Sequence, residues 1–286
     1  MTRTVYLNGE YMPETEAKVS IFDRGFVMAD GIYEVTSVLE GKLIDFEGHL
    51  KRLHRSLNEL DMQAPCSDDE LLAMHRALVE KNALVEGMIY LQITRGNPGD
   101  RSFVFPGADV KPTIVAFTQD IPDLRDAPMA KIGLRVISVQ DIRWGRRDIK
   151  TVQLLAPSMA KMAAKKAGVD DAWMCDGDLV NEGTSNNAYI VKGNKIITHQ
   201  LSNQILHGIT RGAVLRFAAE AQFDIEERPF TIEEAQAADE AFSTAASLFV
   251  MPVVELDGKA IGTGKPGPVA TRLREIYLDE MMKAAI

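Results

Sequence analysis

The chain has 286 residues, of which 46% are hydrophobic and 26% are charged, and its formal net charge is −9. This composition is typical of a globular protein with one large or two smaller domains. The acidic excess argues against a nucleic-acid or anionic membrane partner, because such polyanions are bound by basic faces.

The N-terminal sequence MTRTVYLNGEY turns polar within a few residues, and no run of 18 apolar residues occurs in the chain. We therefore expect no signal peptide, no membrane span and a cytoplasmic location. Cys66 and Cys175 lie far apart without a CxxC motif, and the five histidines include no pair at the spacing of a helical metal site. The sequence therefore predicts neither a disulfide framework nor a metal enzyme.

Tight turns separate β-rich runs in both halves of the chain. Each turn pairs a glycine with Asn, Asp or Glu, which is typical of a β-hairpin. Between the hairpins lie segments whose apolar residues recur with helical spacing. We therefore predict an α+β fold with antiparallel or mixed sheets and helices. The turns are Asn8-Gly9, Glu40-Gly41, Asp176-Gly177, Gly193-Asn194 and Asp257-Gly258, and helices are expected at 47–61, 68–84, 157–167, 211–222, 232–237 and 266–284.

A polar connection divides the chain. Residues 118–128, TQDIPDLRDAP, carry four charges and two prolines between two apolar runs, which is typical of an exposed link between domains. We predict an N-terminal α/β domain over 1–118, an interdomain linker over 119–128 and a C-terminal domain over 129–286. A GxGxxG match at 262–267 follows a hairpin and lacks a βαβ unit, so a loop is expected there.

Lys150 stands among apolar and β-branched residues in the sequence DIKTV. An exposed lysine at the boundary of two elements is the ordinary interpretation of such a position. In apolar surroundings, however, a lysine loses stabilisation of its charge, and its free amine can form a Schiff base with an aldehyde. Arg146 and Arg147 would strengthen this effect. Pyridoxal phosphate is the usual aldehyde partner.

The helix after Lys150 has Pro157 in its first turn and Gly168 just beyond its end. Its apolar residues recur at helical spacing, with lysines between them. We expect the apolar stripe to be buried and the lysines to face water. The stripe is Leu155, Met159, Met162 and Ala163, and the lysines are Lys161 and Lys165.

A pyridoxal phosphate site needs a carboxylate for the ring nitrogen and an anion site for the phosphate. Glu182 ends a β run and precedes a cluster of hydroxyl and amide side chains; a polar hairpin turn is the alternative interpretation. Gly208, Ile209 and Thr210 precede a helix expected to begin near Arg211, and a helix N-terminus binds phosphate. An N-cap threonine is the alternative there and is compatible with phosphate binding.

These three segments, in this order, resemble the class IV (fold type IV) pyridoxal-phosphate aminotransferases. DRGFVMADGIYEVTSV at 23–38 and GHLKRL at 48–53 resemble two further signatures of that family. The resemblance covers nearly the whole chain and is strongest to the D-amino-acid aminotransferases. It implies a two-domain fold with the cofactor at the domain interface, anchored by the C-terminal domain, and a homodimer whose active sites are completed across the subunit interface.

The resemblance also implies roles for individual residues. Lys150 would be the Schiff-base lysine and the acid/base that moves the proton between substrate and cofactor. Glu182 would pair with the pyridine nitrogen. The other cofactor-binding positions would be Arg52, Ile209 and Thr210 at the phosphate, Leu206 on the ring, and Ser185 and Asn187 in its neighbourhood.

Substrate recognition is expected on GIYEVTSV, where Tyr33, Val35 and Ser37 would share one face of a strand. The resemblance implies that Tyr33 holds the substrate carboxylate together with Arg101, which would come from a loop of the neighbouring subunit. Phe103 stands where relatives carry a histidine, and Ser37 stands where close relatives carry a lysine. A more apolar pocket is therefore expected, which favours hydrophobic D-amino acids or (R)-amines.

A second departure lies in EAFSTAASLFVMP at 240–252. The resemblance places a phosphate-binding hydroxyl at the position of Ala246, which follows Ala245. Backbone amides, or the hydroxyls of Ser247 or Thr244, would have to replace it. We therefore expect weaker phosphate binding than is usual in the family.

The expected reaction is a ping-pong transfer of an amino group from a D-amino acid to a 2-oxo acid such as pyruvate or 2-oxoglutarate. Branched-chain L-amino-acid transaminases are an alternative, but their FEGIRAY-like run is not found. (R)-amine transaminases are another, because YEVTSV shares its serine and valine with their YDVPSV pattern. Aminodeoxychorismate lyase, which eliminates pyruvate, and a non-catalytic cofactor-storage protein are the remaining alternatives.

Overall fold

The computed structural model describes residues 2–286, and its backbone contacts divide them into two compact units. Unit 1 holds the chain up to Leu124 together with Ile149–Gln153 and Ala284–Ile286, and unit 2 holds Arg125–Asp148 and Leu154–Lys283. The chain thus leaves unit 1 within the range proposed as a linker. The predicted domain bounds placed Lys150 in the C-terminal domain, but in the structure Lys150 belongs to unit 1.

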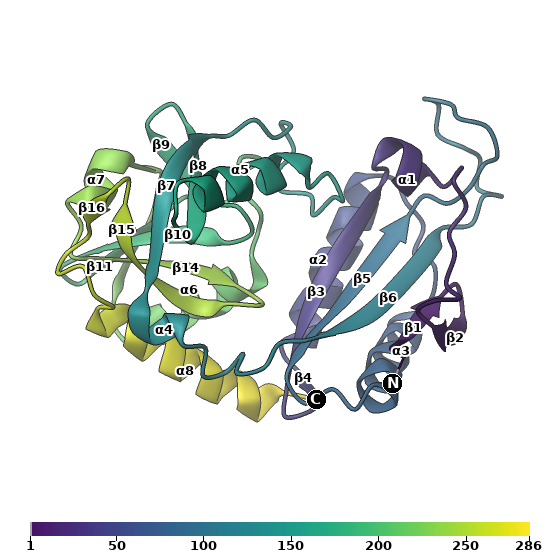
Figure 1. The fold of residues 1–286 in the computed structure, drawn as a ribbon, viewed down its shortest axis with the longest axis horizontal. Helices are drawn as coiled ribbons and strands as arrows, with labels where there is room; N and C mark the ends of the chain where they lie inside the picture. Colours follow the sequence, from purple (N-terminus) through teal and green to yellow (C-terminus); the bar gives the residue numbers. More distant parts are fainter. Residues whose placement is uncertain (1) are drawn as a thin grey trace. The chain divides into compact units, whose positions relative to one another are not determined.

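Unit 1 is built on an antiparallel sheet in the order β2-β1-β6-β5-β3-β4 (Figure 1). The predicted turns at Asn8-Gly9 and Glu40-Gly41 join β1 to β2 and β3 to β4. Its elements are β1 (Thr4–Leu7), β2 (Glu10–Pro13), α1 (Arg24–Met28), β3 (Gly31–Leu39), β4 (Lys42–Leu43), α2 (Phe46–Glu59), α3 (Asp68–Lys81), β5 (Gly87–Thr94) and β6 (Thr113–Asp120).

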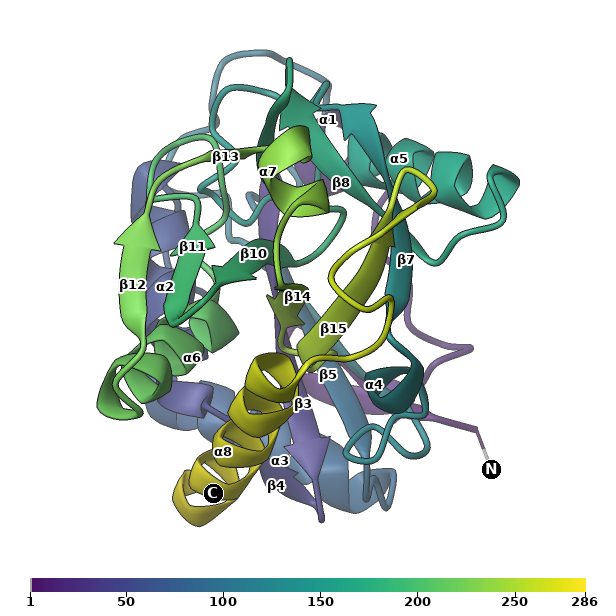
Figure 2. The same cartoon turned by 90° about the vertical axis from the view of Figure 1, so that its left-hand side faces the viewer.

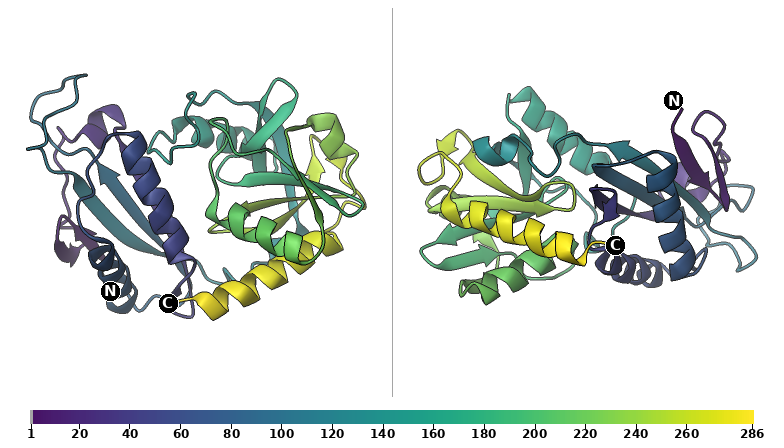
Figure 3. Two further views of the ribbon diagram at one scale, coloured as in Figure 1. Left: turned by 180° about the vertical axis from the view of Figure 1, so that it is seen from behind. Right: turned by 90° about the horizontal axis from the view of Figure 1, so that it is seen from below.

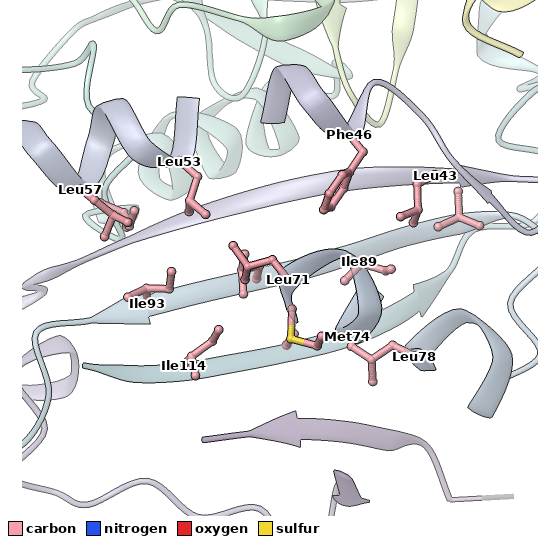
Figure 4. Close-up of a cluster of buried hydrophobic side chains, with 14 of the residues drawn as sticks. Leu43, Phe46, Leu53, Leu57, Leu71, Met74, Leu78, Ile89, Ile93 and Ile114 are labelled. Atoms are coloured by element: carbon pink, nitrogen blue, oxygen red, sulfur yellow. The ribbon is translucent and has the colours of Figure 1, made fainter. Parts of the chain in front are cut away.

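The core of unit 1 lies where α2 and α3 pack on this sheet (Figure 4). Ser67 caps α3 in a capping box with Glu70, whose side chain accepts the Ser67 amide at 2.8 Å. This satisfies two backbone donors and fixes where the helix begins. Apolar residues at intervals of three and four then face the sheet. They include Phe46, Leu53 and Leu57 of α2, Leu71, Met74 and Leu78 of α3, and Ile89, Ile93 and Ile114 of the strands.

The short segment Ile149–Gln153 extends the edge of β3. The Tyr33 amide donates to the Lys150 carbonyl at 2.9 Å, and the Val152 amide donates to the Gly31 carbonyl at 3.1 Å. An antiparallel bridge between Ile32 and Thr151 completes the pairing. The backbone of Lys150 is therefore fixed by a strand of unit 1.

Unit 2 contains a mixed sheet in the order β12-β11-β10-β14-β15-β7-β8-β9-β13, with β16 beside β15 (Figure 2). The pairs β11–β12, β15–β7 and β7–β8 are parallel and the others are antiparallel. The predicted α+β class with mixed sheets is confirmed. The elements are α4 (Met129–Ile132), β7 (Leu134–Gln140), α5 (Leu155–Lys166), β8 (Asp171–Asp176), β9 (Leu179–Gly183), β10 (Asn187–Lys192), β11 (Lys195–Thr198), α6 (Ile209–Glu220), β12 (Asp224–Glu227), β13 (Phe230–Thr231), α7 (Ile232–Gln236), β14 (Glu240–Ala245), β15 (Phe249–Leu256), β16 (Lys259–Ala260) and α8 (Pro268–Ala284).

Helices α6 and α8 lie side by side in unit 2 (Figure 3), with Phe217 and Tyr277 in edge-to-face contact at 6.5 Å between ring centroids. The predicted helix start near Arg211 is wrong, because α6 begins at Ile209. The N-cap is Gly208, so the interpretation of Thr210 as an N-cap is also wrong. The sequence patterns also missed the short helices α1 and α4.

The predicted buried face of α5 is wrong. Leu155, Met159 and Met162 are exposed by 76%, 54% and 60%. The buried residues of α5 are Ala160 and Ala164, which pack on β8. Small side chains on this face let the helix approach the sheet closely, and the larger apolar residues are turned outward.

Among residues 2–286, no helix is long and apolar enough to cross a membrane. Over the same part of the chain, no group of three or more His, Cys, Asp or Glu side chains is arranged to hold a metal ion.

His75 makes the stability of unit 1 dependent on pH. Its Nδ1 lies 2.7 Å from the Leu71 carbonyl and its ring packs edge-on against Phe46, and burial lowers the pKa of His75 from 6.5 to about 4. Below pH 6.5 the unfolded chain therefore binds a proton that the folded chain does not. We predict that the His75 contribution to the free energy of unfolding falls by about 3 kcal/mol as the pH drops from 6.5 to 4.

The measurement is urea unfolding of wild type and His75→Met between pH 7 and pH 4, with His54→Gln, at a half-buried position, as control. The variant lacks the titrating ring, so the difference in free energy between wild type and variant isolates this group. An unchanged difference across the range would contradict the assignment.

Candidate active site

The carboxylate of Glu182 is the centre of the polar site in unit 2. Glu182 is only 3% exposed, and three groups donate hydrogen bonds to it. Arg143 Nη1 reaches Oε1 at 2.6 Å, Asn187 Nδ2 reaches Oε2 at 2.9 Å, and the Leu206 amide lies 3.1 Å from both oxygens. Burial raises the pKa of the Glu182 carboxyl, and Arg143 opposes that rise. A buried acceptor held by directed donors suits a protonated ring nitrogen.

Two turns of the chain bring these donors to Glu182. Glu182 is the second-last residue of β9 and Asn187 begins β10, so the tight connection between the strands places both side chains together. Asn187 Nδ2 also donates to the Leu206 carbonyl at 3.0 Å, which ties the segment before α6 to the hairpin. A Cβ on Gly208 would lie 2.1 Å from Asn187 Oδ1. Glycine is therefore needed where this segment passes Asn187.

The N-terminus of α6 comes directly after Gly208 in the chain. The first amides of an α-helix have no partner within the helix and carry the positive end of its dipole. Ile209 and Thr210 are the first two helical residues, and Thr210 is buried. A helix N-terminus, the kind of site that can bind an anion, thus begins three residues along the chain from Leu206, whose contact with Asn187 supports Glu182.

Arg143 is a residue of this site that sequence reasoning missed. Its Nε and Nη2 donate to the two oxygens of Asp141 at 2.9 and 2.6 Å, while Nη1 contacts Glu182. Asp141 is buried, and it also accepts from Asn181 at 3.1 Å. The only sequence signal was an arginine shortly after a predicted strand, which by itself indicates no partner.

Arg146 and Arg147 were expected to act as cations on Lys150, and both are paired with carboxylates of unit 2. Arg146 Nε donates to Asp148 at 3.0 Å. Arg147 Nη1 lies 2.9 Å from Asp176 and 3.2 Å from Asp141. Because these charges are neutralised locally, the expected effect on Lys150 is not supported.

In unit 1, Lys150 lies over an aromatic ring. Its Nζ is 4.2 Å from the centroid of the Tyr33 ring, which stacks on Tyr90 at 5.5 Å. The flanking residues Ile149 and Thr151 are buried. Tyr33, Val35 and Ser37 alternate along β3 and therefore share one face of the strand. The amine is thus held against the strand face that was expected to recognise substrate.

Arg52 of α2 forms a buried ion pair with Glu34, which follows Tyr33 on β3. Its Nε and Nη2 donate to Glu34 at 2.8 and 2.7 Å, and His49 Nδ1 lies 2.7 Å from the same carboxylate. Although burial opposes ionisation, Arg52 and His49 hold the pKa of Glu34 well below its usual range. The Arg52 guanidinium therefore has a fixed position.

The loop between β5 and β6 carries Arg101 and Phe103. Both are exposed, Phe103 by 80%, and the Arg101 guanidinium lies 4.8 Å from the Phe103 ring centroid. Arg24 anchors the loop by donating to the Ser102 carbonyl, and Asp30 accepts from Arg24 at 2.6 Å.

The remaining residues considered for the cofactor site lie in turns of unit 2, except Thr244, which lies in β14. Ser185 is exposed in the bend between β9 and β10. Ala246 and Ser247 lie in the turn between β14 and β15 and are half-buried. Thr244, considered as a source of a hydroxyl, lies 2.9 Å from the Tyr189 hydroxyl. Its hydroxyl is therefore engaged inside the sheet.

Residues 31–256 match the family model for amino-transferase class IV. The D-alanine aminotransferase of Staphylococcus aureus strain MSSA476 is 40% identical over 273 residues, 95% of each chain. That of Bacillus licheniformis is 37% identical over 284 residues, 98% of this chain and 99% of the relative. The T.th. branched-chain amino acid aminotransferase, solved with pyridoxamine 5'-phosphate, superposes with a TM-score of 0.90 at 26% identity, covering 99% of this chain and 95% of that one. These matches confirm the fold type IV architecture, and the chain belongs to the class IV aminotransferase family.

Proposed function

We propose that this protein is a cytoplasmic, pyridoxal 5'-phosphate-dependent D-amino-acid aminotransferase. It transfers the amino group of a D-amino acid to pyruvate or 2-oxoglutarate by a ping-pong mechanism. Near-full-length identity of 37–40% to D-alanine aminotransferases supports the substrate class. The free thiols of Cys66 and Cys175 agree with a reducing compartment.

The observation that carries the proposal is the buried carboxylate of Glu182 beside the N-terminus of α6. Pyridoxal phosphate carries a basic ring nitrogen at one end and a dianionic phosphate at the other. Unit 2 offers the Glu182 carboxylate as the acceptor for the first and the backbone amides at the start of α6 for the second, and Leu206, whose amide donates to Glu182, lies just before that helix. The donor set therefore fits the cofactor.

When bound, pyridoxal phosphate supplies an aldehyde that takes up the amino group and a ring that accepts electrons. Glu182 would hold the proton on the ring nitrogen, and Leu206 would pack against the ring, with Asn187 and Ser185 around it. Arg52, Ile209 and Thr210 would bind the phosphate. Ala246 and Ser247 would contribute amides and a hydroxyl where the family carries its second phosphate-binding hydroxyl.

Lys150 would be the covalent anchor of the aldehyde and the base that removes the Cα proton of the substrate. Its Nζ rests on the Tyr33 ring at 4.2 Å, an arrangement that limits the rotamers of a flexible side chain. When it acts as the base, the amine would lie near the substrate-facing side of β3. A proton transfer needs such a base within hydrogen-bond reach.

Tyr33, Val35 and Ser37 would form the substrate pocket, with Arg101 and Phe103 supplied by the partner subunit of a homodimer. The exposed apolar residues of unit 1 support this assembly, since apolar side chains that gather on a surface are typical of interfaces. Three of them stand next to Arg101 in the loop, and others lie at the start of α1. They are Phe103, Val104 and Phe105, together with Ile21, Phe22 and Phe26.

Replacing Lys150 by alanine should abolish the visible absorption of the bound cofactor and lower turnover by at least about 10³-fold, because anchor and base are lost together. Lys165→Ala, on the exposed side of α5, is the matched control and should leave both unchanged. Normal absorption and turnover in Lys150→Ala would refute the cofactor proposal.

A substrate panel tests the choice among members of the family. The protein is given D-alanine, D-glutamate, L-leucine or (R)-1-phenylethylamine as amino donor, with pyruvate or 2-oxoglutarate as acceptor, and in a separate assay aminodeoxychorismate without an acceptor. We expect rapid turnover of at least one D-amino acid. Turnover of L-leucine alone would favour a branched-chain enzyme, turnover of the amine alone an (R)-amine transaminase, and pyruvate release from aminodeoxychorismate the lyase.

Subunit complementation tests the role of Arg101. Arg101→Ala should raise KM for the D-amino acid about 10- to 100-fold, because a charge-assisted contact to the carboxylate is lost. Mixing Arg101→Ala subunits with Lys150→Ala subunits should restore activity, since a mixed dimer then has one site with Lys150 and a partner Arg101. Failure of mixed dimers to gain activity over either variant would place Arg101 in its own subunit's site.

A further inference from the structure

Five charged side chains of unit 2, with Glu182 among them, form one network of ion pairs. Arg143 bridges Glu182 and Asp141, and Arg147 bridges Asp141 and Asp176. Two guanidinium groups thus face three carboxylates. With all groups ionised, one negative charge is left over within a largely buried cluster.

Glu182 still has room for a further donor. A carboxylate offers about four lone-pair positions, and three N–H groups donate to it here: Arg143, Asn187 and the Leu206 amide, whose single proton is shared between the two oxygens. Arg143 therefore need not leave when a ring N–H arrives. Its other two nitrogen donors are committed to Asp141, so the guanidinium is clamped from the side away from Glu182.

The charge state of Glu182 decides where the proton lies. A buried carboxyl next to a pyridine nitrogen can share a proton as a neutral acid with a neutral ring, or as a carboxylate with a protonated ring. Burial favours the neutral pair, because separated charges are poorly solvated there. A cation fixed on the far side of the carboxylate favours the charged pair.

We infer that Arg143 is a positioning residue that keeps the Glu182 carboxylate ionised and aimed, so that the cofactor's ring nitrogen holds the proton. This rests on the proposed function, since it concerns the same cofactor. Asp141 serves as the clamp that orients Arg143, and the Arg147–Asp176 pair holds Asp141 in turn. The leftover negative charge is then matched by the positive charge of the protonated ring.

The protonation state of the cofactor's ring nitrogen can be measured directly by NMR. Wild type and Arg143→Met are loaded with pyridoxal phosphate labelled with ¹⁵N in the ring, and the ring nitrogen shift is recorded by NMR at neutral pH. Wild type should give the shift of a protonated ring, and Arg143→Met should move toward that of Glu182→Gln, the reference for a lost carboxylate. Turnover of Arg143→Met should fall about 10²-fold.

Two further variants separate this role from a structural one. Arg143→Lys keeps the positive charge but loses the guanidinium group that bridges Asp141 and Glu182. Its ring nitrogen shift should lie between that of Arg143→Met and that of wild type. Arg146→Met removes a neighbouring arginine that pairs with Asp148, and it should behave as wild type. Should Arg143→Met fail to fold, Arg143→Gln carries the same expectation.

A protonated ring in both Arg143→Met and Arg143→Gln would overturn the inference while leaving the proposed function intact. A wild-type protein that binds no pyridoxal phosphate would overturn both. Loss of the protonated signal in Arg143→Met, with a wild-type signal in Arg146→Met, is the result that supports the role of Arg143.

Discussion

The site depends on one constraint, which is that a carboxylate removed from water must be held by donors. Glu182 is almost fully buried, and an ionised acid in that position is costly unless it is paired and hydrogen-bonded. Its donors come from a loop, a strand and the segment before a helix, namely Arg143, Asn187 and the Leu206 amide. Satisfying Glu182 therefore fixes the path of the chain into α6, and with it the position of that helix's N-terminus.

Unit 1 also contains a buried carboxylate that is held by donors, that of Glu34. Glu34 is buried and held by Arg52 and His49, so the ion pair orients an arginine that would otherwise be flexible. The two faces of β3 hold different residues. Glu34 on one face pairs with Arg52, and Tyr33 on the other face contacts Lys150. Arg52 and Lys150 are thus both held by side chains of β3, which keeps their geometry reproducible.

Local sequence patterns predicted the local structure well. The hairpin turns at Asn8-Gly9 and Gly193-Asn194, and Gly168 just beyond the end of α5, depend on neighbouring residues. The buried face of α5 and the partners of Arg143 depend on tertiary packing, which periodicity does not contain. A stripe such as Met159 and Met162 is equally apolar whether it faces a sheet or the surface, and the choice was made by Ala160 and Ala164. The roles proposed for Lys150 and Glu182 rest on family resemblance, and the structure adds how each side chain is held.

The most direct test of this account is the crystal structure of the protein loaded with pyridoxal phosphate. The account predicts a covalent bond to Lys150, the ring nitrogen within hydrogen-bond distance of Glu182, and the phosphate at the amides of Ile209 and Thr210. A cofactor attached to another lysine, or a ring nitrogen that faces a group other than Glu182, would contradict it.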